Sequence, residues 1–167
     1  MIRLKKLQLA KTKIILGAWL VLLTHISYAQ SSTSQPKATL TLHSQSDFTI
    51  TDNTLAFTEG EQTILSLTVI GPGDKRIDAG MDKTLVISMP ANKDLSIDDW
   101  ENYKAFIEIS GCRCFNRGFN TITNGTLTIS KLDNSRWSIF ADLKATGRDN
   151  NEPILFYFEG EIKASVP

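Results

Sequence analysis

Apolar and polar side chains alternate with a period of two along the last third of the chain. Between positions 137 and 146 one side is apolar: Trp137, Ile139, Ala141, Leu143 and Ala145. Between positions 154 and 164 the following apolar residues share one side: Ile154, Phe156, Phe158, Ile162 and Ala164. Residues 126–129 form a shorter run of the same kind. This period is typical of strands with one buried and one solvated face, so it predicts an antiparallel sheet.

Runs with strand character also occur earlier in the chain, at 38–43, 48–51, 63–70, 84–89 and 105–110. Turn-forming residues separate them, and Asn124-Gly125 is the pair most typical of a two-residue hairpin. About seven to nine short strands at such intervals predict an all-β fold, an antiparallel β-sandwich of immunoglobulin-like or related type. A small β-barrel is the alternative.

One segment has features of a short helix. Ser96 is placed to cap it, with Asp98 in its first turn and Asp99 as the capping-box partner. A helix of about two turns is marginal in water. We therefore expect it to form only if Trp100 is docked on the sheet.

The first 29 residues have the pattern of a cleavable signal peptide. A basic head without acidic residues precedes an apolar run at 14–23, and Ser27 and Ala29 are the small residues read by a signal peptidase. A retained membrane anchor is the alternative, but the run is well short of the ~20 residues that span a bilayer. We predict cleavage after Ala29, a disordered lead-in at 30–37, and a single domain at 38–167 in the periplasm or outside the cell.

Cleavage would change the charge balance of the chain. The leader carries five of the 18 Lys and Arg residues and none of the 18 Asp and Glu residues, so the mature net charge is −5. Phosphate binding needs a basic face, which argues against nucleic acid as a partner. The mature chain also lacks an apolar run that would keep it in a membrane.

The stretch from Gly111 to Phe119 has the clearest chemical character. Cys112 and Cys114 are the two cysteines of the chain, and Arg113 and Arg117 lie beside them. In a regular strand their Cα atoms would be about 6.6 Å apart, near the upper limit for a disulfide. A bridge therefore requires the backbone to bend, which Gly111 and Gly118 permit.

Four interpretations of this pair remain open. Export favours a local disulfide, and free cysteines also pack as small buried hydrophobes. The neighbouring arginines could lower a thiol pKa in a redox-active pair. Two thiolates could also bind Cu(I). Zinc would need further ligands, and the mature chain offers only His43.

Three apolar residues of the last strands lie opposite the main apolar side: Phe140, Leu155 and Tyr157. They either fill the second side of a sandwich strand or form an exposed face for a partner or an apolar ligand.

The sequence contains no nucleophile elbow, and its acidic segment at 94–101 lacks the glycine of a calcium loop. We therefore predict no catalytic residues, no metal and no cofactor. The expected function is that of an exported, non-enzymatic module that binds an unknown protein or a small apolar ligand, or is a structural subunit. A periplasmic thiol, disulfide or Cu(I)-handling protein that uses Cys112 and Cys114 is the alternative.

Overall fold

Strands account for all the regular structure in the described residues. The computed structural model describes residues 37–72, 80–91, 93–147 and 152–167. The strands are β1 (Ala38–Thr51), β2 (Thr54–Glu59), β3 (Gln62–Val69), β4 (Asp82–Met89), β5 (Leu95–Ile97), β6 (Ala105–Ser110), β7 (Gly118–Lys131), β8 (Arg136–Thr146) and β9 (Pro153–Ser165). No helix occurs in these residues, so the all-β class is confirmed. The predicted leader, and the lead-in up to residue 36, lie outside them.

All nine strands belong to one sheet, in the order β2-β1-β3-β4-β6-β7-β8-β9, with β5 added to β7. Pairing is antiparallel except between β1 and β9, which run parallel with Leu40 opposite Ala164. This last pairing joins β1 to the far end of the path, so β1, β3, β4, β6, β7, β8 and β9 form a closed ring. A closed ring is the arrangement of the small barrel named as the alternative. The immunoglobulin-like sandwich is not confirmed.

The main core is built from the inward side chains of the ring. The predicted alternation is confirmed in β8, where Trp137, Ile139, Ala141, Leu143 and Ala145 are all buried. In β9 the residues Ile154, Phe156 and Phe158 are buried in the same cluster. Ile162 and Ala164, farther along β9, are only partly buried.

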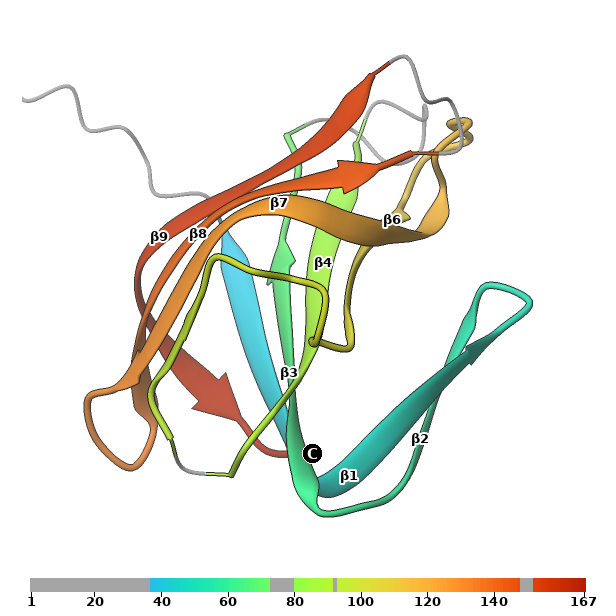
Figure 1. The fold of residues 1–167 in the computed structure, drawn as a ribbon. Coiled ribbons are helices and arrows are strands. Elements are labelled where there is room, and N and C mark those ends of the chain that lie inside the picture. Colours follow the sequence, from blue (N-terminus) through green and yellow to red (C-terminus); the bar gives the residue numbers. More distant parts are fainter. Residues whose placement is uncertain (1–36, 73–79, 92, 148–151) are drawn as a thin grey trace, which may run out of the picture. The chain divides into compact units, whose positions relative to one another are not determined.

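A hairpin adds a second, smaller core. The pairing of β1 with β3 shifts register between His43 and Ser46, and beyond Ser46 β1 pairs only with β2 (Figure 1). Phe48 on this hairpin is completely buried against Ile64 of β3 and Val86 of β4. Lys104 fixes it further, because its Nζ donates to Asp47 Oδ1 at 2.7 Å and to the carbonyl of Phe48. The hairpin therefore acts as a strap across β3 and β4.

The predicted short helix after Ser96 is wrong. Leu95–Ile97 is strand β5, paired with β7, and a turn follows in which Asp99 Oδ1 accepts a hydrogen bond from the Glu101 N–H at 3.2 Å. Trp100 is docked on the sheet as expected, and its Nε1 donates to the carbonyl of Gly125 at 2.8 Å. Strand pairing and this hydrogen bond replace the few internal bonds that a two-turn helix would have.

The hairpin predicted at Asn124-Gly125 is also wrong, because β7 continues through it. The register between β7 and β8 shifts between Ile122 and Asn124, and Gly125 has φ +118°. A Cβ at Gly125 would lie 2.2 Å from the carbonyl oxygen of Asp142. Gly125 therefore lies at a β-bulge inside a long strand. The bulge needs a positive φ at this residue, as a tight turn would.

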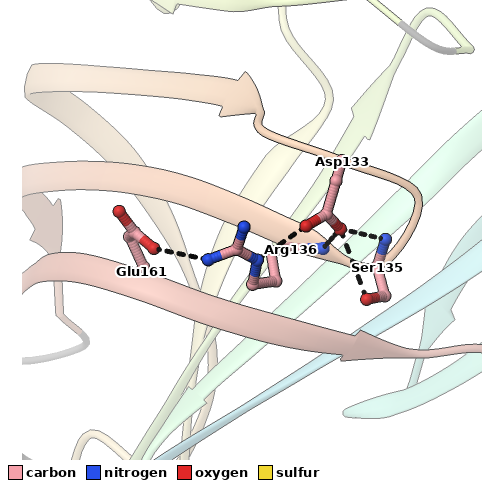
Figure 2. A network of polar contacts seen from close by, with 4 residues as sticks. All are labelled: Asp133, Ser135, Arg136 and Glu161. Atoms are coloured by element: carbon pink, nitrogen blue, oxygen red, sulfur yellow. Dashed lines mark hydrogen bonds and ion pairs between the residues drawn. The ribbon is translucent and has the colours of Figure 1, made fainter.

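The turn between β7 and β8 is held by Asp133. Its Oδ1 accepts the backbone N–H groups of Ser135 and Arg136, both at 2.8 Å, and Arg136 Nε donates to Oδ2 at 2.6 Å. Figure 2 shows how Arg136 also reaches Glu161 of β9, at 3.5 Å. The hydrogen bond from Ser135, followed by those from Arg136, holds the pKa of Asp133 well below its ordinary value.

Candidate functional site

The loop between β6 and β7 contains both cysteines. Cys112 Sγ and Cys114 Sγ are 1.98 Å apart, at bonding distance, and their Cα atoms are 5.2 Å apart. This separation is shorter than the ~6.6 Å of a regular strand, so the backbone bends as a bridge requires. Gly111 and Gly118 stand at the two ends of the bend with φ +76° and +105°. We call residues 111–118 the disulfide loop.

Asn120 fixes this loop to the sheet. The residue is buried, and its Nδ2 lies within hydrogen-bond distance of the carbonyls of Gly118 (2.8 Å), Asn116 (3.1 Å) and Ile107 (3.2 Å). Sequence reasoning missed Asn120, although a polar residue at an inward strand position was a visible signal. Its amide contacts carbonyls of the loop and of β6 together, so the loop is held against the sheet.

A polar hollow lies on one side of the disulfide loop. Its volume is about 610 Å³, and Arg113, Arg117 and Glu108 line it together with Asp52 and Asn53 at the tip of the strap. Burial raises the pKa of Glu108. The strap tip is close to the loop, because a Cβ at Gly118 would lie 2.7 Å from Asn53 Oδ1. The structure thus places both predicted arginines at this hollow.

Two further hollows are largely apolar, with volumes of about 300 and 550 Å³, and the smaller one is lined by Cys114 and Phe115 of the disulfide loop. They share Met81, Lys83 and Leu155, and together we call them the apolar groove. Phe115 lines the first hollow and Tyr157 the second. The groove therefore runs from the disulfide loop along the first half of β9.

Lys83 is the charged residue at the centre of this groove. Its Nζ donates to the carbonyl oxygen of Leu155 at 2.5 Å, a bond between β4 and β9. Burial lowers the pKa of Lys83. This side chain is therefore a polar contact within a largely apolar surface.

The three apolar residues predicted to lie opposite the core are exposed rather than packed. The exposed fractions are 37% for Phe140, 55% for Leu155 and 56% for Tyr157. The rings of Phe140 and Tyr157 meet edge to face, with centroids 6.3 Å apart. The Tyr157 hydroxyl donates to Glu159 Oε2 at 2.6 Å, and this bond raises the pKa of Tyr157. Leu155 and Tyr157 line the apolar groove, whereas Phe140 lies beside it on β8.

His43 is not part of these hollows. Its ring stacks on Phe57 of β2, with centroids 3.9 Å apart, and burial lowers the pKa of His43. Over the described ranges, no three His, Cys, Asp or Glu side chains are grouped as metal ligands. Those ranges likewise contain no helix with the length and apolarity that a membrane span requires.

Comparison with known proteins gives no relative: no family model matches the chain, and no curated protein or solved structure matches it.

Proposed function

We propose that this protein is an exported, non-enzymatic binding module whose apolar groove receives an apolar part of another molecule. The observation that carries the proposal is the gathering of exposed apolar side chains along the two adjoining hollows of the groove: Met81, Phe115, Leu155 and Tyr157. Contiguous exposed apolar surface is costly in water, and in soluble domains it is typical of ligand or partner sites.

Export is supported by the disulfide loop. Two cysteine sulfur atoms at bonding distance fit an oxidising compartment, such as the periplasm or the extracellular space. The signal-like pattern at 1–29 agrees with this compartment.

Binding at the groove is tested with the fluorescent apolar probe 1-anilinonaphthalene-8-sulfonate. We expect Leu155→Ser to weaken probe binding several-fold, because it removes an exposed wall of the groove. Leu132→Ser is the matched control, since Leu132 is 45% exposed and does not line the groove. Equal probe fluorescence in the two variants and the unchanged protein would contradict the proposal.

The alternative function, handling of thiols or of Cu(I), is favoured by the convergence of both sulfur atoms on one loop. While bonded to each other they offer no thiolate, so metal binding would require prior reduction. Titration of the reduced protein with Cu(I), beside a Cys112→Ser and Cys114→Ser double variant, tests it. Equal Cu(I) binding by both proteins would exclude the pair as the site.

A further inference from the structure

Along much of one edge of β9, the backbone groups pair with no strand of the described residues. The Ala164 N–H donates to Ser135 O at 2.7 Å, on the β8 side, whereas the Leu155 carbonyl faces the other way and accepts from Lys83. Backbone groups of successive residues alternate between the two edges of a strand. Tyr157, Glu159 and Glu161 share the parity of Leu155, so their N–H and C=O groups point away from β8.

This edge stays open along most of β9. Within the described part of the chain, β9 has a second strand neighbour only at Ala164 and Ser165, which lie opposite Leu40 and Thr41 of β1. An open row of N–H and C=O groups is a template for pairing with another strand. Beyond the Leu155 carbonyl, which Lys83 occupies, the edge from Tyr157 to Glu161 therefore has no strand neighbour among the described residues.

The open edge and the apolar groove lie together. The larger hollow of the groove is lined by Leu155, Phe156 and Tyr157 of β9, and across from them by Val69, Ile70 and Met81. A strand laid beside β9 would form main-chain hydrogen bonds and direct alternate side chains into this hollow. Main-chain bonds for affinity and alternate pockets for specificity characterise peptide recognition by strand addition.

We propose that the ligand of the groove is an extended segment of a partner polypeptide, bound as an additional strand on the open edge of β9. This inference rests on the proposed binding function and specifies its ligand. The inward side chains of the segment are apolar, because they fill the hollow. Its outward side chains are apolar beside Leu155 and Tyr157 and basic beside Glu159 and Glu161, because opposite charges stabilise cross-strand pairs.

Charge and composition favour a partner segment over two other occupants. A second copy of this chain, paired antiparallel through β9 and centred on Gly160, would place Glu159 of each copy opposite Glu161 of the other, and like charges across strands are unfavourable. The chain's own residues 30–36 read Gln-Ser-Ser-Thr-Ser-Gln-Pro, which supplies no large apolar side chain for the hollow.

The test uses linear 12-residue peptides selected from a phage-displayed random library on the exported protein, then synthesised for affinity measurement. Glu159→Pro removes the outward N–H from the open edge, where proline is tolerated, and Glu159→Ala is the matched control that removes only the side chain. We expect Glu159→Pro to weaken peptide binding by about tenfold relative to Glu159→Ala, as the loss of a main-chain hydrogen bond predicts.

A second measurement keeps the test independent of how well the proline variant folds. Amide hydrogen exchange of the unchanged protein is followed with and without peptide. We expect the Tyr157, Glu159 and Glu161 amides to be slowed by the peptide. Absence of this slowing, or a library that yields no peptide dependent on Leu155, would overturn strand addition.

The outcomes separate this inference from the proposed function. Peptides that bind the Leu155→Ser variant more weakly, yet bind Glu159→Pro and Glu159→Ala equally, would overturn strand addition and leave apolar binding intact.

A dimeric mass in sedimentation equilibrium, with the edge amides protected, would instead make a second copy the occupant. Edge amides protected in the free monomer and released by deletion of residues 30–36 would make the chain's own segment the occupant. Either result would overturn the partner segment.

Discussion

At the scale of single residues, the disulfide loop depends on a buried side chain beside it. Asn120 is 3% exposed, and its amide lies within hydrogen-bond distance of three backbone carbonyls, two of them within the loop. A buried carbonyl that loses its donor carries its full desolvation cost. Asn120 therefore connects the conformation of the candidate site to the stability of the sheet.

Asn120→Ala tests this connection. We expect the free energy of unfolding to fall by about 1–3 kcal/mol, because buried carbonyls are left without donors. Thr121→Ala, the exposed neighbour on β7, is expected to change it by less than about 0.5 kcal/mol. Urea unfolding of both variants gives the two values, and equal effects would contradict the role of Asn120.

The disulfide closes a very short loop, so its effect on stability is expected to be small. The cysteines are separated by two positions, for which the chain-entropy model gives roughly 1.5 kcal/mol. We expect reduction to lower the free energy of unfolding, measured with urea, by about that amount while the β-sheet circular dichroism is retained. The Cys112→Ser and Cys114→Ser double variant should not respond to the reductant. Complete unfolding on reduction would show that the bridge holds the whole fold.

Asp133 makes stability depend on pH in a defined direction. Its folded pKa lies below the value of the unfolded chain, so its stabilisation is present above the unfolded pKa, about 4, and is lost as the pH falls towards the folded pKa. We expect Asp133→Asn to be less stable than the unchanged protein at pH 7, with the difference narrowing below pH ~4. Thermal unfolding at pH 7 and pH 3 measures it. A difference that is constant with pH would contradict this role.

At the scale of elements, the strap formed by β1 and β2 has its own small core. Phe48 is fully buried on it, whereas Phe57 on the same hairpin is 40% exposed and stacked on His43. The strap tip also supplies Asp52 and Asn53 to the polar hollow. Packing of the strap is thus linked to one wall of the candidate site.

Phe48→Ala and Phe57→Ala form a matched pair for the strap. We expect Phe48→Ala to lower the free energy of unfolding by about 3–5 kcal/mol, because it empties the centre of the smaller core. Phe57→Ala should lower it by about 1 kcal/mol or less. Chemical denaturation supplies both free energies. Similar losses in the two variants would show that the strap is not anchored by Phe48.

The same elements show what sequence patterns can predict. Strands β8 and β9, and the part of β7 at 126–129, follow from local alternation, because each has one buried and one solvated face. Asn124-Gly125 was misread because turns and bulges both use a glycine with positive φ. The segment after Ser96 was misread because β5 is stabilised by pairing with β7, about 30 residues later in the chain, and local helix signals carry no information on such contacts.

At the scale of the whole molecule, the closed ring and the groove depend on distant pairs. Leu40 lies opposite Ala164 although the two residues are far apart in the sequence, and no local pattern indicates that register. The bend at the two cysteines was predictable from its residues. So was the position of Phe140, Leu155 and Tyr157 opposite the core-facing side of β8 and β9. Met81 and Lys83 were not predictable as neighbours of Leu155, because the ring brings them together.

Among the described residues, β9 pairs with β8 along one edge, and its other edge pairs with β1 only at Ala164 and Ser165, which leaves it open beside the apolar groove. Amide hydrogen exchange of the free exported protein tests it residue by residue. We expect the Tyr157, Glu159 and Glu161 amides to exchange roughly tenfold or more faster than those of Phe156 and Phe158, which point towards β8. Equally slow exchange at all five amides would contradict the open edge, and with it the site built upon it.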